Sequence, residues 1–69
     1  MQSLTPEISD LDVLYTFDAS AAASAVAYTG AAAKAYDPAV RTKFSDLAVA
    51  SLNAQKQARD LIFKLGGAI

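Results

Sequence analysis

The stretch AYDPAVR, Ala35 to Arg41, divides this sequence into two helical halves. An Asp followed by a Pro is typical of a helix start, because the Asp side chain accepts from free backbone N–H groups and Pro needs no N–H at the first helical position. The residue before a proline is also kept out of the helical region. We therefore expect a first helix to end near Tyr36, a hinge at residues 37–38, and a second helix to begin at Pro38.

The outer ends of both helices carry signals of the same kind. In LTPE, Thr5 is a candidate N-cap and Pro6 a candidate first helical residue. Gly66-Gly67 is typical of a left-handed helix C-cap. Since the connection between the helices is short, they should pack antiparallel. The sequence predicts one all-α helical-hairpin domain over residues 1–69, with helix 1 at about 6–36 and helix 2 at about 38–65.

Small side chains dominate the middle of the first helix. In ASAAASAVAYTGAAA, Ala19 to Ala33, thirteen of fifteen residues are Ala, Ser, Thr or Gly. Small faces let two helices approach to the short end of the ~8–10 Å interaxial range. At 100° per residue, the facing stripe of helix 1 contains Leu14, Phe17, Ala21, Ala25, Tyr28, Ala32 and Ala35. The matching stripe of helix 2 contains Val40, Phe44, Leu47, Ser51, Ala54, Ala58, Leu61, Ile62 and Leu65.

Further apolar residues lie on flanks that one partner helix cannot cover. They are Ile8, Tyr15, Ala22, Val26 and Ala33 on helix 1, and Val49, Leu52 and Phe63 on helix 2. Exposed apolar area favours association by about 25 cal/mol per Å². We therefore expect a homo-oligomer, either a dimer closing into a four-helix bundle or a helical polymer. The predicted self-association residues are Ala21, Ala25, Tyr28, Ala32, Val49, Leu52, Ala54, Ala58 and Phe63.

The composition argues against most chemistry. The 69 residues include no Cys and no His, and six basic against seven acidic residues give a net charge of −1. The absence of Cys excludes disulfides and thiolate metal sites. The basic residues form no stripe of the kind that binds nucleic acid. A di-iron bundle needs several Glu and His residues, whereas Glu7 is the single Glu. We expect no enzymatic activity, no cofactor, no metal and no small-molecule substrate.

The remaining charged residues are expected to form ion pairs. Lys56 and Asp60, and Asp60 and Lys64, are four residues apart, a spacing that favours pairing on a helix. Arg41 could pair with Asp37 or Asp46 near the hinge. Asp18 lies at the edge of the helix 1 stripe, where we expect it to act as a surface charge or to satisfy a Lys or Arg at helical spacing.

Membrane insertion and secretion are not favoured by the sequence. The small-residue stretch is bounded by Asp18 and Lys34, and a transmembrane helix needs ~20 mostly strongly apolar residues. The start MQSLTPEISD lacks the charged and apolar regions of a secretory signal, so synthesis in the cytoplasm without a signal peptide is expected.

Several landmarks resemble the spore coat protein F-like (Coat F) domain, a family of short ferritin-like helical hairpins. The resemblance rests on the start LTPEISDLD, on Tyr28, on Asp37-Pro38 followed by Arg41 and Phe44, and on Gln55 and Gly66. The chain departs from the family pattern at SLNAQ, Ser51 to Gln55, and at its final Gly-Gly-Ala-Ile. The resemblance implies a structural component of the spore coat, with other coat proteins as partners.

The hairpin is also similar in outline to type III secretion needle subunits, which polymerise into tubes. The similarity rests on the Pro-containing turn and the segment DPAVRTKFSDL, Asp37 to Leu47. Those subunits usually carry a Trp near the N-terminus, and this chain has none. This second resemblance implies an extracellular helical filament, and it stands beside the coat interpretation as an alternative.

Overall fold

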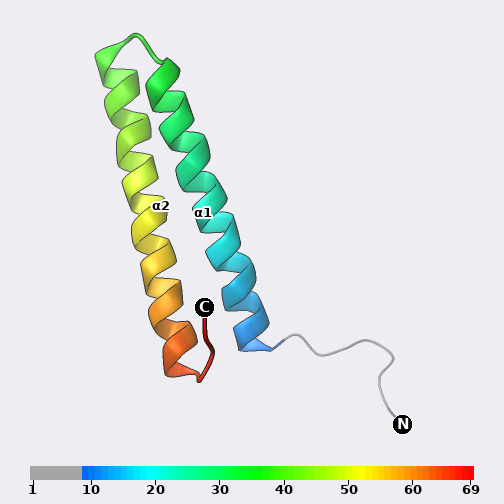
Figure 1. Ribbon diagram of the computed structural model, residues 1–69. Helices are drawn as coiled ribbons and strands as arrows, with labels where there is room; N and C mark the ends of the chain where they lie inside the picture. The colour runs from blue at the N-terminus through cyan, green and yellow to red at the C-terminus, as the bar shows by residue number, and fades with distance from the viewer. Residues whose placement is uncertain (1–8) are drawn as a thin grey trace, which may run out of the picture.

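The computed structural model describes residues 9–69, which form an antiparallel hairpin of two long helices (Figure 1). α1 spans Asp10–Lys34 and α2 spans Pro38–Lys64. The predicted all-α hairpin is confirmed. Each helix is about 40 Å long at 1.5 Å per residue, so the hairpin is a single layer, one helix thick and two helices wide.

A reciprocal capping box sets the beginning of α1. Ser9 is extended, and its Oγ accepts a hydrogen bond from the Asp12 backbone N–H at 3.1 Å. The Asp12 carboxylate in turn accepts from the Ser9 backbone N–H at 3.2 Å. The predicted cap at Thr5 and start at Pro6 lie outside the described residues. Within them, α1 begins at Asp10, because two donors are satisfied here by side chains of its own first turn.

The hinge differs slightly from its prediction. α1 ends at Lys34, and Ala35 is already extended with φ −75° and ψ 135°, so the helix stops two residues before Tyr36. Asp37 is also extended and accepts from the Val40 backbone N–H at 3.0 Å, as expected of an N-cap. The chain needs extended residues before Pro38 to reverse direction. Tyr36 is consequently left 99% exposed.

The C-terminal end of α2 is a Schellman motif, which confirms the predicted glycine cap. Gly66 adopts φ 87°, a left-handed conformation that glycine takes without a steric penalty. Its N–H donates to the Phe63 carbonyl at 3.1 Å, and the Gly67 N–H donates to the Ile62 carbonyl at 2.8 Å. The chain therefore turns sharply and runs back alongside the helices (Figure 1).

Small side chains fill the contact between the two helices. Among the described residues the buried apolar side chains are Ala21, Ala25, Ala48, Ala58 and Ile62. Nearer the hinge, the Tyr28 and Phe44 rings pack with centroids 6.2 Å apart. Ala48 was not in the predicted stripe, although its neighbour Leu47 was. The contact is thus mostly methyl against methyl, with Ile62 as the one large, fully buried side chain in the described part of the chain.

Candidate self-association surfaces

The predicted self-association residues separate into two groups. Ala21, Ala25 and Ala58 are buried between the two helices of one chain. Tyr28, Ala32 and Ala54 are half-buried at the edges of the same contact. Val49, Leu52 and Phe63 are instead more than half exposed. The first group therefore holds one hairpin together, and the second group remains available to a neighbour.

One broad side of the hairpin carries an open groove at its centre. The groove has a volume of about 400 Å³ and is lined by Ala22, Ala25, Val26, Thr29, Leu52 and Gln55. Val26, one of these lining residues, is 74% exposed. We call this feature the central groove, and the side of the hairpin that carries it the groove face. The lining includes no charged side chain, and Gln55 supplies its one amide.

A second groove, which we call the base groove, lies near the open end of the hairpin. It has a volume of about 370 Å³ and is lined by Asp10, Val13, Leu14, Leu61, Lys64 and Leu65. Val13 and Val26 project about 100° to either side of the buried stripe of α1, as do Leu61 and Phe63 on α2. The base groove therefore lies on the side opposite the groove face.

This arrangement corrects part of the predicted helix stripes. Phe17, Val40, Leu61 and Leu65 were expected between the helices, but each is between 43% and 52% exposed. The stripes drawn from the sequence were wider than the contact that two helices can make. Once Ile62 occupies the centre of the contact, Leu61 is turned about 100° away from it.

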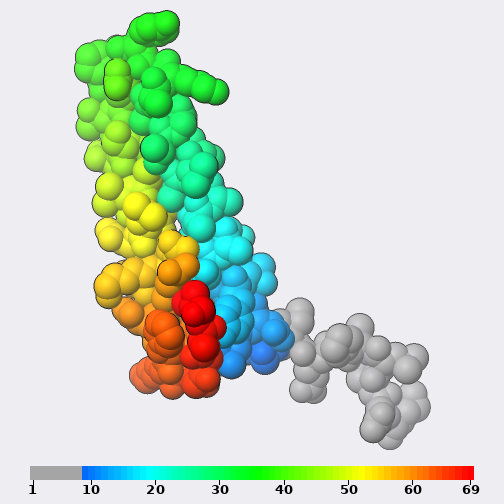
Figure 2. Space-filling view, in the orientation of Figure 1, coloured from blue at the N-terminus to red at the C-terminus, as the bar shows by residue number. Residues whose placement is uncertain are grey.

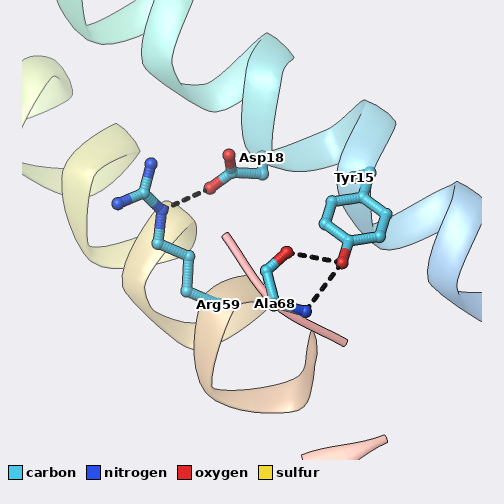
Figure 3. Close-up of polar contacts among 4 residues, drawn as sticks. All are labelled: Tyr15, Asp18, Arg59 and Ala68. Atoms are coloured by element: carbon cyan, nitrogen blue, oxygen red, sulfur yellow. Dashed lines mark hydrogen bonds and ion pairs between the residues drawn. The ribbon is translucent and has the colours of Figure 1, made fainter. Parts of the chain in front are cut away.

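The chain after α2 folds back over the base of the groove face (Figures 2 and 3). The Tyr15 hydroxyl donates to the Ala68 carbonyl at 2.6 Å and accepts from the Ala68 N–H at 3.0 Å. A Cβ on Gly67 would lie 2.7 Å from the Tyr15 hydroxyl oxygen and 2.8 Å from Ile62 Cγ2. Only glycine permits this approach without displacement. We call residues 66–69 the tail, and it thickens this end of the groove face.

An ion pair links the two helices between the tail and the central groove (Figure 3). The Arg59 Nε donates to the Asp18 carboxylate at 2.8 Å. This hydrogen bond, and with it the positive charge of Arg59, lowers the pKa of Asp18, while partial burial opposes the shift. The hydrogen bond with Asp18 in turn raises the pKa of Arg59. Asp18 therefore pairs with a residue of the other helix, 41 positions away, and not with a Lys or Arg at helical spacing as the sequence suggested.

The other ion pair in residues 9–69 follows helical spacing. Lys56 Nζ lies 3.0 Å from Asp60 Oδ2, which confirms one of the two predicted pairs on α2. Asp60 has no such contact with Lys64, and Arg41 has none with Asp37 or Asp46, in the described part of the chain. The Asp37 carboxylate instead accepts the hydrogen bond from the Val40 backbone N–H that caps α2.

The Asp18–Arg59 pair predicts a pH dependence of stability. The pKa of Asp18 is lowered on folding, so the pair stabilises the hairpin above the usual aspartate pKa of 3.8 and loses its effect as the pH falls through the lower folded value. Asp18→Asn is therefore expected to destabilise the protein at neutral pH, and the gap to wild type should close in acid. Urea unfolding followed by circular dichroism from pH 7 to pH 2 measures this gap.

Asp60 provides the matched control, because its pair with Lys56 is exposed on α2. Asp60→Asn should change stability little at any of these pH values. A gap between Asp18→Asn and wild type that persists unchanged into acid would contradict the assignment of the effect to this ion pair.

No group of three or more Asp or Glu side chains in residues 9–69 is placed to hold a metal ion. Neither α1 nor α2 combines the length and apolar character that a membrane-crossing helix requires.

Comparison with known proteins gives no relative. No protein-family profile, characterised protein or solved structure matches this sequence. The surfaces of the hairpin are therefore the basis for inferring its function.

Sequence reasoning missed three features of these surfaces. The base groove escaped because Leu61 and Leu65 were assigned to the helix contact. The contacts Tyr15–Ala68 and Asp18–Arg59 join residues 53 and 41 positions apart, which no local pattern reveals. The aromatic residue at 15, placed on an apolar flank, was the one available signal for a contact there.

Proposed function

We propose that this chain is a non-enzymatic structural protein that assembles with copies of itself. The observation that supports this proposal is a single-layer hairpin with an apolar groove on each broad side. Domains normally bury their apolar surface between at least two layers of secondary structure. The exposed large apolar side chains on the two sides include Val13, Phe17, Val26, Val49, Leu52, Leu61, Phe63 and Leu65.

The size of one hairpin face fits a self-association interface. A face about 40 Å long and about 20 Å wide offers roughly 800 Å², which is the area that a stable interface buries on each partner. A second hairpin laid on such a face forms a four-helix bundle with an enclosed core. Supplying a second layer in this way is one of the usual routes by which a small chain without disulfides or metal gains stability.

The use of the polar groups also supports a structural role. Asp12 and Asp37 cap helices, and Asp18 and Asp60 form ion pairs. Ser and Tyr side chains have no histidine to activate them, because the sequence contains none. Four of the seven acidic side chains thus have structural roles, and the proposal assigns the protein no substrate and no cofactor.

For the biological setting we propose a spore coat or a related sporulation layer. The support is the resemblance to the Coat F domain, and the residues that carry it have structural roles here. Tyr28 packs on Phe44, Asp37 caps α2, and Gly66 provides the left-handed turn. Other coat proteins would then be the further partners. Detection of the protein in purified spore coats, and its loss from coats of a deletion strain, tests this setting.

The base groove favours a second candidate, an open filament subunit. A chain with apolar surfaces on opposite sides can bind one neighbour on each, and such heterologous contacts build helical polymers. An extracellular filament would be the setting of this alternative.

Size-exclusion chromatography with light scattering, over a hundredfold range of protein concentration, tests self-assembly and separates the two candidates. A fixed mass of two chains supports the closed bundle. Mass that rises with concentration, with filaments visible by electron microscopy, supports the polymer. A monomer at every concentration would contradict the proposed function.

A further inference from the structure

We propose that the central groove is a two-fold interface at which a second copy of this chain binds antiparallel, so that the central grooves of the two copies face one another. This inference rests on the proposed self-assembly and specifies its surface and orientation. It assigns the groove face, rather than the base groove, to the contact that forms the dimer.

The position of the central groove along the hairpin is the first argument. Ala22 is the middle residue of α1, Asp10–Lys34, and Leu52 is one residue from the middle of α2, Pro38–Lys64. A two-fold axis that crosses the hairpin at half its length therefore places groove on groove and overlaps the full ~40 Å of both copies. The base groove lies at one end, so an antiparallel two-fold contact centred on it would overlap the base alone.

The second argument is that the groove face protrudes further at the base of the hairpin than toward the hinge. At the base, the tail lies across Tyr15 and raises the surface (Figure 2). Toward the hinge, the helical positions on this face carry the short side chains of Thr29, Ala33 and Ser45 and the longer side chain of Arg41, which lies five turns from Arg59 on the same side of α2. An antiparallel partner sets its raised base against this end, which the tail does not cover. A parallel partner would bring two tails to the same height.

The chemistry of the lining is the third argument. The central groove is lined by apolar and uncharged side chains, whereas Asp10 and Lys64 line the base groove. Burying unpaired charge opposes association. The charged side chains one helical turn from this lining are Asp18, Lys56 and Arg59, and each of them is held in an ion pair. Covering the groove face thus costs less than covering the base groove.

Cysteine cross-linking tests the orientation, because the chain has no cysteine of its own. In the antiparallel dimer each Ala22 lies beside the two-fold axis, next to Ala22 of the other copy. Ala22→Cys is therefore expected to give disulfide-linked dimer within minutes of adding a mild oxidant. In a parallel dimer Ala22 would face Leu52 instead, so linkage would require a mixture of Ala22→Cys and Leu52→Cys chains.

Two further variants serve as controls for position. Ala23→Cys lies on the exposed side of α1 and should stay unlinked. Val13→Cys, in the base groove, should also stay unlinked under the same conditions. A fourth variant, Leu52→Asp, places a charge in the interface and should weaken dimerisation by more than about tenfold while the far-ultraviolet helical spectrum is retained.

The outcomes separate this inference from the proposed function. Linkage of Ala22→Cys alone, in a protein that is dimeric by light scattering, supports the antiparallel groove contact. A dimer that links only through Val13→Cys, or only in the mixture of Ala22→Cys and Leu52→Cys, overturns the inference and leaves self-assembly intact. A monomer that links at no position overturns both.

Discussion

Ile62→Ala should remove a large part of the stability of the hairpin. Ile62 is 0% exposed and is the one large, fully buried side chain in residues 9–69. Truncating a buried Ile to Ala costs about 2–5 kcal/mol, because the lost apolar contacts are joined by the cost of a cavity. A chain of this size has a total free energy of unfolding of roughly 3–10 kcal/mol. Chemical unfolding by urea, followed by circular dichroism at one fixed protein concentration, measures the loss.

Leu61→Ala is the matched control for this experiment. Leu61 is adjacent in sequence and similar in size, but 49% of it is exposed on the opposite flank of α2. Its truncation should cost roughly 1 kcal/mol, as expected for half the burial. Equal losses for Leu61→Ala and Ile62→Ala would contradict the central position of Ile62 in the helix contact.

Ala25→Leu is expected to destabilise the hairpin by about 1–3 kcal/mol. Ala25 is buried where α1 faces α2, and three extra carbon atoms would force the two helices apart or drive side chains from their preferred rotamers. Ala54→Leu should cost less, because Ala54 is half-buried at the edge of the contact. The midpoint of urea unfolding should fall in that order.

Ala23→Leu separates packing from helix propensity. The substitution is the same and lies on the same helix, but Ala23 is exposed. Because Ala and Leu differ little in helix propensity, stability should stay nearly unchanged. Melting curves that coincide for Ala25→Leu, Ala23→Leu and wild type would contradict the close packing of small side chains.

Local signals in the sequence were enough for the outline of the fold. Asp37-Pro38 and Gly66-Gly67 each act through their own backbone geometry, so the hinge and the end of α2 lie close to where they were expected. The end of α1 differs from its expected position near Tyr36 by two residues, because Ala35 is already extended. The cap of the described helix is Ser9, where Asp12 completes the capping box, and this cap was not predicted from the sequence.

The surfaces were harder to predict than the fold. A helical stripe shows that Leu61, Ile62 and Leu65 share one side of α2, but not which of them reaches the other helix. That depends on the angle at which the two helices meet, which the small residues of α1 decide jointly with Ile62. Of the candidate interface, Val49, Leu52 and Phe63 were recognised as a flank that one partner helix does not cover. The central groove could not be predicted from this flank alone, because residues of α1 form its other wall.

The contact between Tyr15 and Ala68 has a consequence for the order in which the molecule folds. The Tyr28–Phe44 packing close to the hinge closes a short loop, whereas the tail contact joins residues 53 positions apart. Closing a longer loop costs more chain entropy, so the helices should associate first at the hinge and zip toward the open end. The tail then docks last, onto Tyr15, after the packing of α1 against α2 has brought Tyr15 close to the end of α2. In hydrogen exchange, the amide of Ala68 should accordingly open more readily than the amides near Phe44, and its protection would mark the fully closed hairpin.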